Sequence, residues 1–264
     1  MESALEEIEF LALSSNRVEV LRLLSDGPRT RNELASETGA SQATLGRILG
    51  DFEERSWVRR EGSKYEATAT GRLVSRGFTD LLEILETEGE LRGIVRYLPT
   101  RAMDFDLRHL ADATITVPSE TRPNAPVQRV LDLLDDADEV RAFSHAFNEQ
   151  SLTVVQERTT AGEQTFEAVL SRHAVSALAE DSTLRRRLES LLDADAAEIR
   201  TRNEDIPLAV TIVDDVVHLL VRDGSGVLRA SVDTDDETVR SWARDTFDEY
   251  WESASPLDRD EFSS

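Results

Sequence analysis

The chain has 264 residues, no cysteine and a formal net charge of −23, from 53 acidic and 30 basic side chains. The lack of cysteine excludes disulfides, thiolate zinc sites and cysteine nucleophiles. No apolar run approaches the ~20 residues of a membrane span, and the acidic N-terminus is unlike a signal peptide. We therefore expect a cytoplasmic protein with no metal, no cofactor and no membrane partner.

The basic residues are almost all arginine, and Lys64 is the single lysine. Repulsion among so many negative charges destabilises a compact fold at low ionic strength. At 1 M salt the Debye length falls to about 3 Å and the repulsion is screened. This composition predicts a halophilic protein, and the alternative is an ordinary acidic protein.

Residues 16–77 differ from the rest of the chain in their charge. They carry eleven basic and nine acidic side chains, whereas the remainder of the chain is strongly acidic. A segment that keeps positive charge within such a chain favours a polyanionic partner.

The same segment contains local signals for three helices. The first begins at Asn16, and the capping-box sequence Thr30-Arg31-Asn32-Glu33 opens a second that runs to Thr38. After a turn at Gly39, Ser41 caps a third helix, whose apolar residues recur at helical spacing: Leu45, Ile48, Leu49 and Phe52. The pattern predicts a helix-turn-helix.

Two short extended runs follow, residues 57–60 and 65–68, and they predict a β-hairpin with basic residues on its arms and tip. The segment from Thr30 to Val74 resembles the winged helix-turn-helix of archaeal and bacterial transcription regulators. The resemblance lies in a Gly-x-Ser turn, Thr-x-x-Arg-x-Leu in the third helix, and a Tyr-x-x-Thr-x-x-Gly exit. Ser56 departs from this pattern, because many relatives have glycine there.

Helical geometry selects the residues that would contact double-stranded DNA. The N-terminal half of a recognition helix enters the major groove, where arginine pairs with guanine and glutamine with adenine. The helix N-terminus would hold a phosphate, and the hairpin would straddle a minor groove or its phosphates. The alternative for each charged residue is a solvated side chain. The predicted DNA-binding residues are Arg31, Ser41, Gln42, Ala43, Thr44, Arg47, Arg59, Arg60 and Lys64.

Residues 78–98 form a leucine-rich helical connector. Such a connector beside a winged helix either pairs with its copy in a homodimer or packs against its own C-terminal domain. Both alternatives remain open from the sequence.

From residue 99 to residue 255 the pattern alternates between strands and helices. Residues 208–213, 216–221 and 227–232 are separated by short polar turns, which predicts antiparallel neighbours. A final amphipathic helix runs from Asp235 to about Ser253. We expect an α+β protein with a winged helix-turn-helix (1–77), a connector (78–98), a mixed α/β regulatory domain (99–255) and an acidic tail (256–264).

The second domain shows no pattern that argues for catalysis. Its histidines lack paired-ligand spacing, and the position of the only lysine excludes a P-loop, a Schiff-base lysine and a His-x-Lys phosphodiesterase motif in this domain. The acidic clusters at 132–138 and 233–236 are interpreted as solvated faces. We expect a chain with no catalytic residues that is not an enzyme.

The domain order, the domain lengths and the tryptophan-rich final helix resemble the archaeal regulators related to the regulator of methanogenesis and filament formation. The resemblance implies a dimeric, sequence-specific transcription regulator whose second domain senses a small-molecule effector or mediates oligomerisation. One alternative is an enzyme or metabolite-binding protein with an accessory DNA-binding domain. Another, an architectural chromatin protein, requires broad basic surfaces that the charge of this chain argues against.

Overall fold

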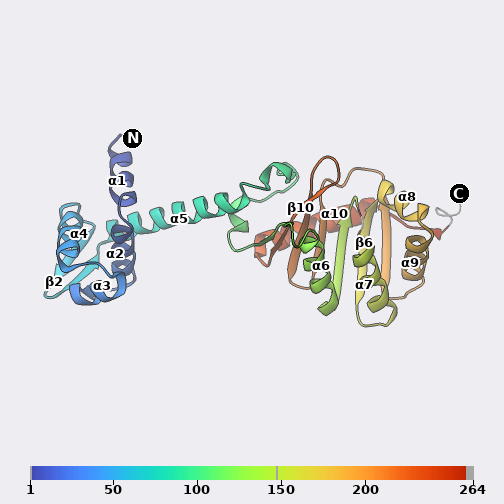
Figure 1. Ribbon diagram of the computed structural model, residues 1–264, viewed down its shortest axis with the longest axis horizontal. Coiled ribbons are helices and arrows are strands. Elements are labelled where there is room, and N and C mark those ends of the chain that lie inside the picture. The colour runs from blue at the N-terminus through green and yellow to red at the C-terminus, as the bar shows by residue number, and fades with distance from the viewer. Residues whose placement is uncertain (1, 147, 260–264) are drawn as a thin grey trace. The chain divides into compact units, whose positions relative to one another are not determined.

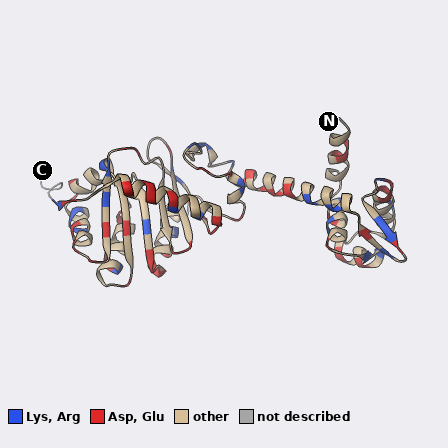
Figure 2. Cartoon of the chain, turned by 180° about the vertical axis from the view of Figure 1, so that it is seen from behind, with Lys and Arg blue, Asp and Glu red and all other residues tan. Residues whose placement is uncertain are grey.

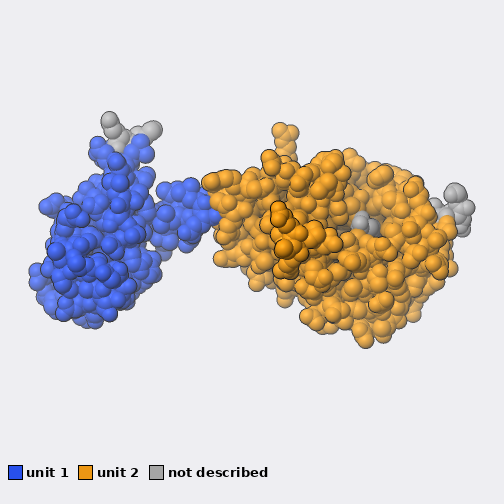
Figure 3. All heavy atoms as spheres, in the orientation of Figure 1, with its two compact units in different colours: residues 1–86 blue, residues 87–264 orange. Residues whose placement is uncertain are grey.

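A computed structural model describes residues 2–146 and 148–259 of the chain. The chain divides into two compact units, residues 1–86 and residues 87–264, which Figure 3 shows in different colours. Each unit has a hydrophobic core of its own. Within the described ranges, no helix combines the length and the apolar character needed to cross a bilayer.

The first unit consists of helices around a small antiparallel sheet of order β1-β3-β2 (Figure 1). Its elements are α1 (Glu2–Ala12), α2 (Ser15–Asp26), β1 (Arg29–Thr30), α3 (Arg31–Thr38), α4 (Gln42–Glu54), β2 (Val58–Glu61), β3 (Lys64–Ala67) and α5 (Ala69–Leu91). The predicted cap at Asn16 is wrong, since α2 begins at Ser15 with Ser14 in the capping position. The backbone carbonyl of Ser14 accepts hydrogen bonds from the amides of Arg17 and Val18, so the first turn forms one residue earlier than the sequence suggests.

Helix α1 was not predicted, and it completes the core of the first unit. Its Phe10 ring makes edge contacts with Phe52 of α4 and with Trp57, at centroid distances of 6.2 and 6.0 Å. The guanidinium groups of Arg17 and Arg55 lie 4.0 and 3.7 Å from the centroid of the same ring. Phe10 is therefore held by aromatic and cation–π contacts that join α1, α2 and α4.

Thr68 and Gly71 join the hairpin to α5 through a close backbone contact. The Thr68 hydroxyl donates to the Ser56 carbonyl at 2.7 Å, and the backbone amide of Gly71 donates to that hydroxyl at 3.0 Å. A Cβ atom on Gly71 would lie 1.9 Å from the carbonyl oxygen of Trp57. The threonine and glycine of the exit motif are thus required by hydrogen bonding and by space.

Ser56 adopts a left-handed conformation, with φ of 59°. Non-glycine residues pay about 1–2 kcal/mol in this region because Cβ approaches the following carbonyl. The backbone at Ser56 therefore has a conformation that glycine adopts without strain, which agrees with the glycine that many relatives have there. Its backbone groups are nevertheless fully used, since the Ser56 amide donates to Glu53 and its carbonyl accepts from Thr68 and Thr70.

We predict that Ser56→Gly raises the free energy of unfolding by about 1 kcal/mol, because the strain disappears and the backbone hydrogen bonds remain. Ser63→Gly is the matched control. Ser63 is also exposed but does not have positive φ, so glycine there lowers stability by enlarging the unfolded ensemble. Thermal unfolding of both variants at one molar-range salt concentration checks the prediction, and a Ser56→Gly protein that melts below the wild type would contradict it.

The second unit is a single mixed sheet covered by helices on both faces. Its strands are β4 (Thr114–Thr116), β5 (Glu139–Ser144), β6 (Thr165–Ser171), β7 (Ala197–Arg202), β8 (Ala209–Val213), β9 (Val216–Arg222), β10 (Leu228–Thr234) and β11 (Ser255–Pro256). Its helices are α6 (Ala125–Asp136), α7 (Glu149–Thr160), α8 (Arg172–Glu180), α9 (Ser182–Leu192) and α10 (Glu237–Ser253), with 3₁₀ turns η1 (Val95–Tyr97) and η2 (Leu107–Leu110). This mixed composition agrees with the expected α+β class.

The strand order is β11-β7-β6-β5-β8-β9-β10-β4, in which β5, β6 and β7 run parallel and the other pairs are antiparallel. The predicted antiparallel neighbours β8, β9 and β10 are confirmed. Helices α6 and α7 lie in front of the sheet in Figure 1, and α10 lies behind it. One core cluster fills the space under α6–α9, and the other fills the space under α10.

The structure divides the predicted connector between two environments. Leu91, Ile94 and Leu98 are buried in the core under α10, so this part packs against the second unit. Leu82 and Leu85 of α5 are exposed.

The predicted tail, residues 256–264, starts inside the fold. Pro256 pairs with Arg200 of β7, and Leu257 is buried in the core under α6–α9. Residues 260–264 lie outside the described residues. The pairing of β11 with β7 depends on where β7 lies in the sheet, and sequence periodicity does not show the order of strands.

Candidate nucleic-acid interface

Local capping sets the positions of α3 and α4. The Thr30 hydroxyl accepts from the Glu33 amide while the Glu33 carboxylate accepts from the Thr30 amide, which is the predicted capping box. Gly39 ends α3 with φ of 69°, a conformation that favours glycine. The Ser41 hydroxyl then caps α4 by accepting from the Thr44 amide at 3.1 Å. Both helix starts are therefore confirmed.

Helix α4 has one buried face and one exposed face. Leu45, Ile48, Leu49 and Phe52 are each no more than 1% exposed, as the helical spacing predicted. On the other face Gln42, Ala43 and Arg47 are exposed, while Thr44 is half-buried and lies 2.9 Å from the Ser41 hydroxyl. The side chains selected for base contact thus lie on the accessible side of the helix, apart from Thr44, which is bound to the cap.

Polar side chains of α3 lie against this face. The Gln42 side-chain nitrogen donates to the Asn32 carbonyl oxygen at 3.1 Å. The Arg31 guanidinium lies 3.5 Å from where a Cβ atom on Gly46 would stand, whereas a Cβ on Gly50 would meet nothing within 4 Å. Neither glycine therefore provides close backbone packing against a neighbouring helix. Asn32 was not among the DNA-binding residues predicted from the sequence. Its position at the start of α3, inside the capping-box sequence, could have indicated that it lies beside α4.

The hairpin β2–β3 carries the predicted residues Arg59, Arg60 and Lys64. Figure 2 colours basic side chains blue and acidic ones red. Arg59 is paired with Glu61 and Glu66, and the hydrogen bond that it donates to the Glu66 carboxylate raises the pKa of its guanidinium. Arg60 donates to the Gly62 carbonyl at 2.9 Å and lies 5.5 Å from the Tyr65 ring centroid. Lys64 is exposed.

An unpredicted strand connects the hairpin to α3. In the β1–β3 pair, Thr30 stands opposite Lys64. Because Thr30 is also the cap of α3, this pairing places the base of Lys64 next to the start of the helix that carries Arg31. The structure therefore places Arg31 beside α4, the helix that carries Gln42 and Arg47. The β1–β3 pair connects Lys64 to the start of α3.

In the second unit, the interpretation of residues 233–236 as a solvated face holds for Asp235, which is exposed, and is wrong for Asp233 and Asp236. Asp233 is buried, and its carboxylate binds His218 Nδ1 at 2.5 Å and Arg129 Nε at 2.7 Å. Burial acts to raise the pKa of Asp233, and the contacts with His218 and Arg129 outweigh it, so the pKa is lowered. Asp236 caps α10 by accepting from the amides of Thr238 and Val239. Asp233 and Asp236 are structural because they lie in a strand and a helix start that interact with the distant residues His218, Arg129 and His109.

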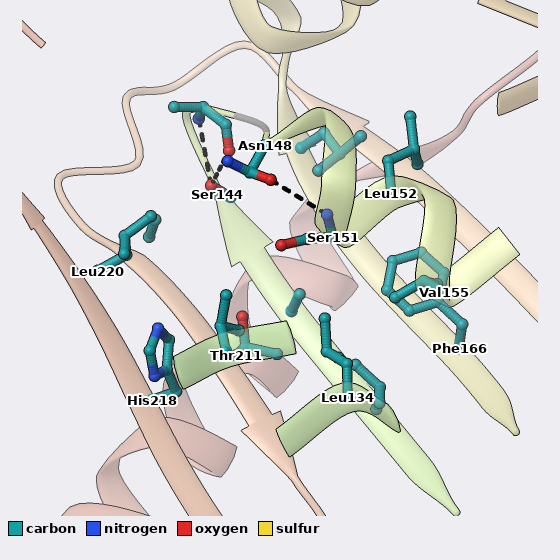
Figure 4. Close-up of a pocket in the computed structure, with 16 residues that line it drawn as sticks. Leu134, Ser144, Asn148, Ser151, Leu152, Val155, Phe166, Thr211, His218 and Leu220 are labelled. Atoms are coloured by element: carbon teal, nitrogen blue, oxygen red, sulfur yellow. Dashed lines mark hydrogen bonds between the residues drawn. The ribbon is translucent and has the colours of Figure 1, made fainter. Parts of the chain in front are cut away.

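His218 also lines a small apolar cavity between the sheet and helices α6 and α7, shown in Figure 4 with Leu134, Val155 and Thr211. The cavity has a volume of about 80 Å³. Among the described residues, no group of three or more histidine, aspartate or glutamate side chains is placed to hold a metal ion.

Two family models match the chain. Residues 123–253 match the middle domain of the methanogenesis regulatory protein FilR1. Residues 5–90 match the HVO_A0261 N-terminal domain. These matches support the expected relationship to an archaeal family of transcription regulators, and the first of them falls inside the region where the resemblance was expected.

Solved structures show more distant likeness. TrmBL2, described as an archaeal chromatin protein with a novel mode of DNA binding, is 16% identical with a TM-score of 0.44, over 95% of this chain and 98% of that chain. A phospholipase D family member, Nuc from Salmonella typhimurium, is 15% identical with a TM-score of 0.40, over 55% of this chain and 98% of that chain. Because both TM-scores are below 0.5, neither likeness carries an argument about function. A comparison with curated proteins finds no match.

Proposed function

We propose that the chain is a sequence-specific DNA-binding transcription regulator of a halophile, with a winged helix-turn-helix in its first unit. In this proposal α4 is the recognition helix and the β2–β3 hairpin is the wing. The second unit is a non-catalytic domain that senses an effector. The matches to regulator families support the general class, and the charge distribution of the first unit supports the DNA-binding surface.

The observation that carries the proposal is the pairing state of the basic side chains. Most arginines of the first unit are bound to acids, as in the pairs Arg17–Asp51, Arg29–Glu37 and Arg55–Glu7. Arg31, Arg47, Arg60, Lys64 and, on α5, Arg76 have no ion-pair partner among the residues that the structure describes, and the first four belong to the predicted DNA-binding set. In a chain of net charge −23, cations left unpaired around one exposed helix favour an external polyanion.

The roles of the individual residues follow from their chemistry. Arg47 is exposed in the N-terminal half of α4, where it can donate two parallel hydrogen bonds to guanine. Gln42 uses one side-chain N–H for Asn32, which leaves its second N–H and its carbonyl for an adenine edge. Arg31, Arg60 and Lys64 would contact phosphates. Arg59 must first exchange its glutamate partners for phosphate, so we expect it to contribute less than Lys64.

We predict that Arg47→Ala weakens operator binding by about 1–3 kcal/mol and relaxes preference at one base position, because a bidentate base contact is lost. Lys64→Ala, the matched control, should weaken operator and scrambled DNA by the same factor, since a phosphate contact carries no sequence information. Binding titrations against a library of single-base operator variants measure both effects. Equal losses on all sequences for the two variants would remove Arg47 from base recognition.

We also predict an unusual salt dependence. Ordinary DNA-binding domains lose affinity steeply with salt, because phosphate contacts release counterions. Here the acidic remainder of the chain repels the duplex at low salt, and that repulsion is screened as the Debye length falls from about 10 Å at 0.1 M to about 3 Å at 1 M. Operator affinity should stay flat or rise between tenths-molar and molar potassium chloride. Titrations with circular dichroism at each salt concentration test this, and a steep loss by a protein that stays folded would contradict it.

The exposed part of α5 supports a homodimer within the same proposal. Leu81, Leu82 and Leu85 recur at helical spacing and are exposed, and a groove of about 740 Å³ lined by Leu81 and the buried Phe78 lies between α1, Trp57 and α5. Exposed leucines on one helix face fit the same face of a second copy, which makes an isologous contact. A two-fold dimer also suits a palindromic operator.

We predict that Leu85→Asp converts a dimer to a monomer in molar salt, because a charge would be buried at the helix contact. Leu73→Asp is the control, since Leu73 is 72% exposed and lies more than three turns from Leu85, about 120° around α5. Light scattering during gel filtration of the full chain measures the mass. A wild-type monomer, or dimers of both variants, would exclude this face as the interface.

A further inference from the structure

A cleft in the second unit collects basic side chains at one edge of the sheet. Strands β5, β6 and β7 are parallel, and β9 runs in the same direction because two antiparallel pairings separate it from β5. These strands end at a common edge, where each is completed or followed by a polar residue: His145, Arg172, Asn203 and Arg222. In open α/β sheets, ligands bind in the crevice outside these strand ends.

The cleft has the size of a metabolite site. Its volume is about 660 Å³, and His145, Arg172, His173 and Arg222 are among the residues that line it. Small-molecule sites typically occupy about 300–1,000 Å³. The acidic side chains on its wall are Asp205 and Asp223, and Asp223 is already paired with Arg229 through its carboxylate.

Two nitrogen atoms in this cleft lack partners. Arg222 Nε and His145 Nδ1 are buried, and neither has a hydrogen-bond partner among the described residues. Arg222 does donate through Nη1 to the Gly226 carbonyl at 2.9 Å, which fixes its guanidinium in place. An unpaired buried polar atom costs about 1–3 kcal/mol and more when charged, so a position that keeps two of them is typical of a binding site.

The electrostatics agree with this geometry. Burial lowers the pKa of the Arg222 guanidinium. Burial and then the charge of Arg222 lower the pKa of His145, and they outweigh a hydrogen bond with the Ile206 backbone that acts to raise it. Both shifts have the sign expected for cationic groups that lack a negative partner. Although the chain has 53 acidic residues, none of those that the structure describes pairs with Arg222 or His145. The negative charge would therefore have to come from a ligand.

We propose that this cleft binds a small anion bearing at least two negatively charged oxygen atoms, held by Arg222 and His145 at the strand ends. The anion would accept from Arg222 Nε and from Nδ1 of the His145 imidazolium, and Arg172 also lines the cleft. Arg172 is held by Asn203, which accepts from its Nε at 2.6 Å. Guanidinium groups favour phosphate and carboxylate because paired N–H groups match paired oxygens. An anion held by several hydrogen bonds can compete with chloride in molar salt, whereas an anion held by a single contact cannot.

This inference rests on the proposed function only for what binding would do, since it gives the effector its chemical class. The site can be tested without DNA on the full chain in molar potassium chloride. The probes are inorganic phosphate, for a phosphoryl ligand, and succinate, for a dicarboxylate. Acetate and further chloride are the controls, because they carry a single charge.

For the wild type we expect one of the two probes to raise Tm with increasing concentration, by mass action. The same probe should shift the NMR titration of His145 to higher pH, since a neighbouring anion favours the imidazolium. Phosphate alone would assign the site to a phosphoryl group, and succinate alone to a dicarboxylate. No Tm response and no His145 shift with either probe, in a protein that circular dichroism shows to be folded, would overturn the proposal.

Variants separate this site from general charge. Arg222→Gln should weaken the binding of the effective probe by about ten- to hundredfold while leaving the unliganded Tm unchanged or higher, because a buried unpaired charge is removed. Arg186→Gln is the matched control, since its guanidinium is exposed on α9, donates to the Ser182 carbonyl of the same helix and does not line the cleft. It should lower Tm slightly and keep the affinity. Equal losses of affinity in the two variants would overturn the assignment.

If the DNA-binding proposal fails while the His145 shift is observed, the cleft remains an anion site without a regulatory role. If DNA binds but the shift is absent, the regulator stands and the effector is not an anion in this cleft. The two failures are therefore distinguishable.

Discussion

Electrostatic repulsion is the constraint on which the rest of this structure depends. A chain of net charge −23 must bring its elements together against that repulsion, and it does so largely through arginine. Arg17 and Arg55 show how this works in the first unit. Each pairs with an acid of another helix and also lies over the Phe10 ring, so one side chain contributes an ion pair and a cation–π contact. Arg200 and Arg202 stack on Trp251 and Tyr250 in the second unit in the same way.

Many arginines pair internally, and an arginine without an acidic partner is informative where its position also suits a ligand. Arg47 on α4 and Arg222 at the end of β9 lack an acidic partner among the described residues, although acidic residues are abundant in this chain. Arg47 is exposed, which suits an extended ligand such as a duplex, whereas Arg222 is half-buried in a cleft, which suits a small one. The same electrostatic criterion therefore separates two kinds of candidate site by their burial.

The sequence predicted those features that depend on neighbouring residues. The capping box at Thr30 and Glu33, the cap at Ser41 and the turn between β8 and β9 are local, and the structure contains all three. Features set by distant residues were missed. Asp233 was interpreted as solvated because its partners Arg129 and His218 are remote in sequence. The cleft also escaped notice, although basic residues directly after predicted strands were a usable signal once strand direction was known.

The single lysine adds a last argument about how charge is used. Arginine presents a rigid planar fork that binds carboxylates in pairs, and on this hairpin Arg59 is indeed bound to Glu61 and Glu66. Lysine has a compact, strongly hydrated ammonium group that is not preorganised for a carboxylate. Lys64 stands opposite Thr30 in the β1–β3 pair and remains exposed. At this position an arginine would have the nearby glutamates as competing partners, whereas a lysine keeps its charge accessible, which is what a phosphate contact on the proposed wing requires.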